Sequence, residues 1–116
     1  MKLRIHDNTI RLRLTRSEVS QLRDTGLVRD VIQFGSGASL AYSVECSRDE
    51  TKLQACFRDS SLRVTVPEGQ VSHWASSEDV GIEAPDAQPA VLIEKDFQCA
   101  HRADLDPEAY PNPLLN

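Results

Sequence analysis

Four basic side chains near the N-terminus are the residues of this chain whose types and spacing most suggest a binding site for an anion. They are Lys2, Arg4, Arg11 and Arg13. The segment Asp7-Asn8 tolerates the left-handed backbone of a two-residue turn, so the residues on either side are expected to pair as a β-hairpin. In that register the cations form two directly opposed pairs, Arg4 with Arg11 and Lys2 with Arg13. Like charges at opposed positions destabilise a sheet, so a neighbouring group should offset them.

Three arrangements would relieve this repulsion. Carboxylates from neighbouring strands or from the C-terminal segment would neutralise the cations, and Glu94 and Asp96 are the first choice because a returning strand can lie beside the first hairpin. A bound anion would have the same effect, whether phosphate, a carboxylate ligand or a stretch of nucleic-acid backbone. A slip in strand register would separate the charges instead. The other acidic candidates are Glu45, Glu83 and Asp104.

A second group of reactive side chains lies near the C-terminus and comprises Lys95, Cys99 and His101. The Cys-x-His spacing could present a thiolate and an imidazole to one metal ion. A structural zinc site normally uses four such ligands, and no Cys-x-x-Cys pair supplies the others. The sequence therefore predicts no metal site and no cofactor, and leaves these three residues as a functional cluster without an assigned reaction. No Gly-rich phosphate loop or Ser-His-Asp order is present, so catalytic residues stay unassigned.

Three further residues have both a structural and a chemical interpretation. Cys46 falls on the apolar side of its strand and is expected in the core. Cys56 falls opposite Arg63, and because a nearby guanidinium stabilises a thiolate, Cys56 is the better candidate for a reactive thiol, although an inert thiol is the simpler interpretation. Trp74 follows Val71 at helical spacing, which favours core packing over a ligand platform.

The composition limits the class of protein. A chain of 116 residues is expected to form one domain with an ordinary core, since 40% of its residues are hydrophobic and 27% are charged. No apolar run approaches the roughly 20 residues of a membrane span, so no membrane partner is expected. The net charge of −5 argues against nucleic-acid binding. An odd number of cysteines, three, argues against a disulfide framework and for a cytoplasmic protein.

The first half of the chain predicts the order strand, strand, helix, strand, strand. Alternation of apolar and polar residues gives the hairpin described above. A capping-box pattern at Thr15 and a stop at Gly26 predict a helix over residues 16–25. Residues 27–34 and 40–46 alternate or are rich in β-branched side chains, and they predict two further strands.

This pattern occurs a second time. Sliding the chain by 52 residues places Ile10–Leu14 over Leu62–Val66 and preserves the apolar spacing of the following helix. The shift predicts an internal repeat of one ββαββ unit, with pseudo-repeats over residues 1–46 and 53–97. The match is weakest in the strands that follow each helix.

The expected fold is α+β, with the strands in a mostly antiparallel curved sheet or barrel and two helices on its apolar face. The domain is expected to cover residues 1–97, and residues 98–116 to form an extended, Pro-rich acidic tail. The alternation predicts one shared core. Its expected members are Leu3, Ile5, Ile10, Leu12, Leu14, Phe57, Leu62, Val64, Val66 and Trp74.

Several segments resemble a small family of uncharacterised bacterial proteins, and together they span nearly the whole chain. They are Met1–Ile5 with Asn8, Ile10–Thr15, Ser17–Val19, Glu94–Phe97 with Cys99, and Tyr110–Pro113. The resemblance implies a bacterial cytoplasmic protein that carries a domain of unknown function. It transfers no catalytic residue to this chain.

These features favour a small non-enzymatic binding or protein-interaction module. An exposed strand edge would allow a homodimer or the addition of a partner's strand, and the basic hairpin would allow a small anion. The alternative is a small enzyme or a metal-dependent protein whose site lies where Glu94–His101 meets the first hairpin. A deep pocket lined by Arg4, Arg11, Lys95 and Cys99 would favour that alternative.

Overall fold

The computed structural model describes residues 1–97, 110 and 113–115. These residues form eight strands, two α-helices and one short 3-10 helix, so the α+β class predicted from the sequence is confirmed. The strands are β1 (Lys2–His6), β2 (Thr9–Leu14), β3 (Leu27–Gln33), β4 (Ser39–Ser47), β5 (Gln54–Arg58), β6 (Ser61–Pro67), β7 (Gly81–Ala84) and β8 (Ala90–Lys95). The helices are α1 (Arg16–Thr25), α2 (Glu68–Ser76) and η1 (Pro113–Leu115), the last in a segment expected to be extended.

Strands that are consecutive in sequence without an intervening helix pair as antiparallel hairpins, β1–β2, β3–β4, β5–β6 and β7–β8. The β1–β2 register is the predicted one, with Arg4 opposite Arg11 and Lys2 opposite Arg13. The turn of this hairpin, Asp7-Asn8, has φ angles of 46° and 60°. These values are typical of a type I′ turn, whose twist matches that of the paired strands. The β5–β6 turn has the same backbone, with φ angles of 52° and 58°.

Helix α1 begins and ends where its local signals predict. Thr15 Oγ1 accepts a hydrogen bond from the Glu18 backbone N–H, and Glu18 Oε1 accepts one from the Thr15 N–H, which completes a capping box. Gly26 ends the helix in the left-handed conformation, with φ of 81°. Helix α2 has no side-chain cap, and Pro67 precedes it as the N-cap residue.

The strands divide between two four-stranded sheets, in the orders β1-β2-β8-β7 and β3-β4-β6-β5. The mostly antiparallel arrangement is confirmed, but the central pairs β2–β8 and β4–β6 are parallel, and no barrel closes within the described residues. Each helix carries the chain from one sheet to the other. The hairpins before and after a helix therefore cannot be neighbours, and each pairs with a hairpin from the other half of the chain.

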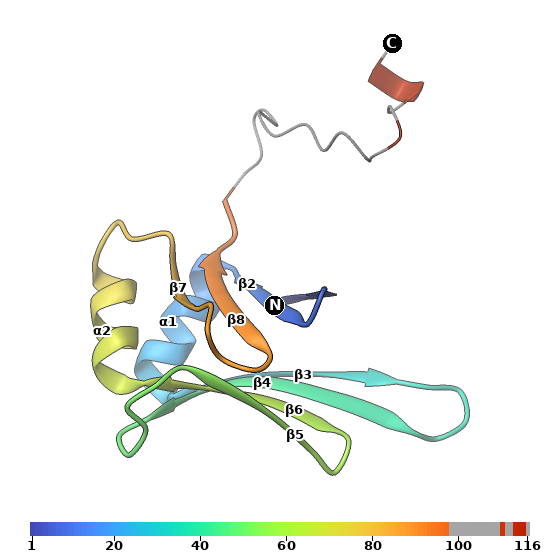
Figure 1. Cartoon of the computed structure of the whole chain (residues 1–116), viewed down its shortest axis with the longest axis horizontal. Helices are drawn as coiled ribbons and strands as arrows, with labels where there is room; N and C mark the ends of the chain where they lie inside the picture. The colour runs from blue at the N-terminus through green and yellow to red at the C-terminus, as the bar shows by residue number, and fades with distance from the viewer. Residues whose placement is uncertain (98–109, 111–112, 116) are drawn as a thin grey trace.

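The core lies between the two sheets and beneath the helices, which pack against each other. Figure 1 shows α1 and α2 side by side at one end of the sheets, and the turns of the β3–β4 and β5–β6 hairpins at the other end. Trp74 is buried, and its Nε1 donates a hydrogen bond to the Val80 carbonyl oxygen at 3.0 Å, so its predicted core role is confirmed. The side chains with almost no exposure are those of Leu12, Leu14, Leu22, Val44, Val64, Val66, Val71, Trp74, Val91 and Ile93.

The predicted core is wrong at Ile5 and Phe57, which are 67% and 66% exposed, and Leu3 is only partly buried. Both exposed residues have the inward-facing register, since Ile5 lies opposite Ile10 and Phe57 lies opposite Leu62. They lie next to the hairpin turns, at the strand ends farthest from the helices. Alternation therefore gave the correct face, but no helix covers that end of the sheets.

Within the described residues, no helix combines the length and the apolar character that crossing a membrane requires.

Candidate functional site

The basic hairpin is neutralised by carboxylates from the end of β8. Glu94 Oε1 accepts hydrogen bonds from Arg11 Nε at 2.6 Å and from Arg13 Nε at 2.8 Å. Lys2 Nζ lies 2.9 Å from Asp96 Oδ2. The carboxylate partners that the sequence favoured are therefore confirmed, and three of the four cations predicted as an anion site are paired within the protein.

The parallel pairing of β2 with β8 creates this cluster. It places Glu94 directly opposite Arg13, on the strand face that also carries Arg11. The Glu94 side chain is only 12% exposed, so water competes weakly for its oxygen atoms. The hydrogen bond from Lys2 lowers the pKa of Asp96 and keeps this carboxyl ionised.

Arg4 is the remaining cation of the hairpin, and its side chain has no hydrogen-bond or ion-pair partner among the described residues. Its side chain is exposed, and it lines a shallow surface hollow with His6, Asp7 and Arg11. The repulsion between Arg4 and Arg11 is therefore relieved from the Arg11 side only, through Glu94.

Lys95 is the described member of the predicted cluster Lys95, Cys99 and His101. Its Nζ donates a hydrogen bond to the Ser77 carbonyl oxygen at 2.8 Å and lies 5.9 Å from the centre of the Trp74 ring. Cys99 and His101 lie outside the described residues, so the cluster stays a prediction. Within the described part of the chain, no group of three or more His, Cys, Asp or Glu side chains could hold a metal ion.

The two described thiols, Cys46 and Cys56, are both free. Cys56 is exposed and lies opposite Arg63 as predicted, but Arg63 Nε is directed to Glu45 Oε1 at 3.3 Å. Cys46 is only partly buried against the core. Burial raises the pKa of the Cys46 thiol, and the nearby Glu68 carboxylate raises it further, which favours an inert, protonated sulfur.

The N-terminal ammonium of Met1 forms a charge cluster that the sequence did not indicate. It donates a hydrogen bond to Glu18 Oε2 and lies 3.2 Å from Asp30 Oδ2. Tyr42 Oη donates to the Met1 carbonyl oxygen at 3.3 Å. Burial by itself would raise the pKa of Glu18, but the bonds from Met1 and Thr15 outweigh it, so this pKa is lowered. The cluster ties β1 to α1 and β3, and its contacts are structural.

An apolar groove opens between the two sheets at the end that no helix covers, and we call it the open-end groove. It encloses about 270 Å³. Its apolar lining comprises Leu3, Ile5, Ile10, Leu40, Ala55, Phe57, Leu62 and Pro89, and Asn8, Thr9 and Cys56 complete it. The sequence analysis missed this groove because it assigned Ile5 and Phe57 to the core.

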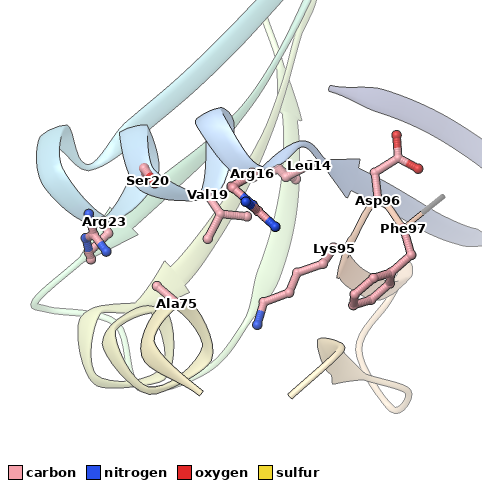
Figure 2. A pocket seen from close by; sticks show the side chains of 9 residues that line it. All are labelled: Leu14, Arg16, Val19, Ser20, Arg23, Ala75, Lys95, Asp96 and Phe97. Atoms are coloured by element: carbon pink, nitrogen blue, oxygen red, sulfur yellow. The ribbon is translucent and has the colours of Figure 1, made fainter. Parts of the chain in front are cut away.

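A second cavity, the α1 cavity, lies between helix α1 and the residues that follow β8, and it encloses about 290 Å³. Its lining comprises Leu14, Arg16, Val19, Ser20, Arg23, Ala75, Lys95, Asp96 and Phe97. Figure 2 shows Arg16 and Lys95 extending into the space between α1 and the chain end of β8. Lys95, Asp96 and Phe97 belong to the Glu94–His101 segment that the sequence analysis considered for a site, whereas the lining residues on α1 were missed. The spacing of Arg16 and Arg23 on one helix face was the signal that could have found them.

Comparison with known proteins adds a family but no activity. No curated protein and no solved structure matched the chain. The model of a family of unknown function, DUF7009, matches residues 1–114. This match covers nearly the whole chain and agrees with the resemblance noted in the sequence to a family without an assigned activity. The chain therefore belongs to the family of unknown function DUF7009.

Proposed function

We propose that this protein is a non-enzymatic protein-interaction module and that a second copy of the chain occupies its open-end groove. The observation that carries the proposal is the exposure of Ile5 and Phe57, at 67% and 66%, on either side of an apolar groove. Large apolar side chains grouped around a groove are typical of an interaction surface, whereas isolated exposed ones are not.

The apolar surface continues from the groove onto the β3–β4 hairpin. Ile32 lies opposite the groove residue Leu40, and Phe34 follows directly after β3, where its N–H donates a hydrogen bond to the Ala38 carbonyl oxygen at 2.8 Å. Ile32 and Phe34 are 43% and 51% exposed. Figure 1 shows that this hairpin projects beyond the rest of the domain, so its apolar tip is accessible to another molecule.

The area of this surface suits a dimer. At about 200 Å² for a large apolar side chain, the exposed fractions of Ile5, Ile32, Phe34 and Phe57 together offer roughly 450 Å². A standard interface buries about 800 Å² per partner, of which somewhat more than half is apolar. These four side chains therefore supply most of the apolar area that one partner of a stable dimer needs.

A second copy is the occupant because the molecule carries both a projecting apolar tip and an apolar groove. In a twofold dimer each surface patch meets its counterpart, so the tip of each copy can lie on the groove of the other. Such an isologous contact uses the same residues twice and closes the assembly at two chains. The sequence analysis predicted a dimer contact through a strand edge, and this stays a second way for two copies to associate. The edge strands are β1 and β7 in one sheet and β3 and β5 in the other.

The oligomeric state tests the proposal. Sedimentation velocity from about 0.1 to about 10 µM, a range of about two decades around a micromolar dissociation constant, should show a monomer–dimer equilibrium. Phe57→Glu should make the protein monomeric, because a charge cannot be buried unpaired in an apolar contact. Phe97→Glu is the matched control, since Phe97 is 61% exposed and lies outside the groove, and it should leave the dimer intact.

Three outcomes would contradict the proposal. A wild-type protein that stays monomeric throughout the range has no dimer to explain. A dimer that survives Phe57→Glu would exclude the groove and leave the strand edges as the contact. Loss of the dimer in both variants would mean that the contact is not specific to the groove. Circular dichroism of each variant establishes that it is folded before its mass is compared.

We also propose that the two halves of the chain are copies of one unit. The supporting observations are the shared order strand, strand, helix, strand, strand and the common turn backbone of β1–β2 and β5–β6. The registers agree as well, since Leu3 lies opposite Leu12 and Ala55 lies opposite Val64, each 52 residues apart between the halves. In this view the groove is lined by equivalent residues, such as Ile5 and Phe57.

The predicted cytoplasmic location belongs to the same proposal, and two free thiols, Cys46 and Cys56, support it. The bacterial origin implied by the sequence resemblance stays a prediction. The alternative of a small enzyme or metal-dependent protein at the junction of Glu94–His101 with the first hairpin has less support. Two of the described residues in that segment, Glu94 and Asp96, are already bound to cations of the hairpin.

A further inference from the structure

We propose that the α1 cavity binds a small organic anion in which a carboxylate or phosphate is joined to an apolar body. This inference is independent of the dimer, because the α1 cavity and the open-end groove share no residue. Its volume of about 290 Å³ is near the lower limit of cavities that hold small ligands, which run from about 300 Å³.

The cavity is built on one face of α1. Arg16, Val19, Ser20 and Arg23 are spaced by three and four residues, so their side chains lie in one stripe along the helix. Lys95, Asp96 and Phe97 line the other side of the cavity at the end of β8, and Asp96 N–H donates a hydrogen bond to the Leu14 carbonyl oxygen at 2.9 Å. Helix and strand end are therefore held side by side by the backbone, and the cavity between them is preformed.

The charge in the cavity is positive. Arg16, Arg23 and Lys95 line it, and Asp96 is the only carboxylate that the described part of the chain contributes to the lining. That carboxylate is bound to Lys2 at 2.9 Å, and Figure 2 shows it pointing away from the Lys95 side chain. It therefore does little to neutralise the cations inside. An oxyanion would find a positive potential here that the described residues leave uncompensated.

Two of these cations have hydrogen-bond donors to spare. Arg16 has no hydrogen-bond or ion-pair partner among the described residues. Lys95 uses one donor on the Ser77 carbonyl oxygen, which leaves two of the three ammonium protons. Arg23 is directed to its neighbour Asp24 at 2.9 Å, in an exposed pair. We therefore assign the oxyanion to Arg16 and Lys95, which both line the cavity.

The rest of the lining is apolar and would hold the body of the ligand. Leu14 and Val19 are buried and form the floor, and Ala75 of α2 adds a small side wall. Phe97 is 61% exposed at the rim, where its ring could close over an apolar group. A ligand without an apolar part would leave these surfaces uncovered, which is why inorganic phosphate alone should bind poorly.

The equivalent site in the other sheet shows that this charge is not a necessity of the fold. Lys95 lies opposite Leu14, and Cys46 occupies the same place opposite Val66 in the other sheet. The first residue of α1 is Arg16, whereas the first residue of α2 is Glu68, which pairs with Arg48 at 3.2 Å.

The equivalent site in the other sheet therefore pairs its charges within the protein, with a carboxylate at the start of α2. The α1 site instead has a guanidinium at the start of α1 and an ammonium at the end of β8. Arg16 in place of the equivalent Glu68, and Lys95 in place of the equivalent Cys46, both raise the positive charge at the α1 cavity. The described residues offer no structural partner for the Arg16 side chain.

Isothermal titration calorimetry on the full chain tests this with four probes. Phenyl phosphate and 3-phenylpropionate each combine an oxyanion with an apolar ring, the first as a phosphate and the second as a carboxylate. At least one of them should bind with a dissociation constant in the micromolar to low millimolar range. The alcohol 3-phenylpropanol lacks the charge, and inorganic phosphate lacks the apolar body. Each should bind about tenfold more weakly or not at all.

Three variants locate the site. Arg16→Gln and Lys95→Gln should each weaken the better probe about tenfold. Arg4→Gln is the matched control, because Arg4 is also unpaired and exposed but lies outside the cavity, and it should leave binding unchanged. Circular dichroism confirms folding.

Three results would overturn the proposal. The first is that none of the probes binds, and the second is that 3-phenylpropanol binds as tightly as the charged probes. The third is that Arg4→Gln abolishes binding while Arg16→Gln binds with the wild-type affinity. The last of these would place the anion on the first hairpin.

Discussion

The shared carboxylate of Glu94 offers a sharp test of how the basic hairpin is stabilised. In Glu94→Gln the shape is retained but the charge is lost, so Arg11 and Arg13 lose their common partner. The arginines also remain opposite Arg4 and Lys2 in the β1–β2 register. The substitution should therefore weaken the fold without creating a cavity.

The contacts give the size of the effect. A hydrogen bond to a charged group contributes about 1.5–3 kcal/mol, whereas an exposed ion pair contributes about 0.2–1 kcal/mol. Glu94 is 12% exposed, but Arg11 and Arg13 are 31% and 39% exposed, so each bond should lie between these ranges. We expect about 1 kcal/mol for each of the two bonds, or about 2 kcal/mol in total, which lowers the Tm of a domain of this size by about 8 °C.

The loss of unfolding free energy in Glu94→Gln relative to wild type is measured by urea unfolding and thermal melts, in low salt and in about 1 M NaCl. Screening by salt should reduce it by about half, because the Debye length falls to about 3 Å. Glu45→Gln is the matched control. Glu45 makes one ion pair, to Arg63 at 3.3 Å, and its side chain is 34% exposed, so the cost should stay below about 0.5 kcal/mol.

Equal costs for Glu94→Gln and Glu45→Gln at low salt would refute the assignment of Glu94 as the neutralising partner. The anion interpretation of the hairpin gives a different signature. Phosphate or sulfate would then raise the Tm of the wild-type protein, and Arg11→Ala would abolish that rise. Without a bound anion, Arg11→Ala should destabilise the fold and leave the Tm insensitive to these ions.

Two further predictions concern the core and the response to pH. Leu12→Ala should cost about 2–5 kcal/mol in urea unfolding, because Leu12 is 1% exposed, whereas Ile5→Ala should cost less than about 1 kcal/mol, and similar costs would contradict the description of the open end. The pKa of Glu18 is lowered in the folded state from its ordinary 4.5, so its contribution to stability is present above that pH and is lost as the pH falls through the folded-state value. Burial by itself would lower the pKa of the Met1 ammonium, but its bonds to carboxylates outweigh burial and raise it from 8.0, so that contribution is lost as the pH rises through the folded-state value. Melts from pH 3 to pH 10, a range that includes the ordinary pKa values of 4.5 and 8.0, should therefore show the largest stability difference between wild type and Glu18→Gln at intermediate pH. A constant difference would contradict the linkage.

Local structure was predictable from the sequence because short-range interactions decide it. The Asp7-Asn8 turn and the alternation on either side were sufficient to give the β1–β2 register. Thr15 and Gly26 were sufficient to give both ends of α1, since each satisfies backbone groups of the nearest turn. Every one of these signals acts over a few residues.

The partners of the basic residues were only partly predictable. The repulsion within the hairpin showed that carboxylates were needed, and Glu94 and Asp96 were among several acidic residues able to supply them. Arg11 and Glu94 are 83 positions apart in sequence. Their contact depends on β8 lying parallel to β2, and this pairing follows from the exchange of hairpins between the two halves.

The two cavities were decided by the tertiary structure alone. Alternation showed that Ile5 and Phe57 face inward, but a residue is buried only if another layer covers it, and both helices lie at the opposite end of the sheets. Arg16 and Lys95 likewise line the same cavity because Asp96, at the end of β8, is hydrogen-bonded to Leu14, which precedes α1. Sequence patterns specify which face of an element is apolar or charged, whereas the packing of distant elements determines what that face meets.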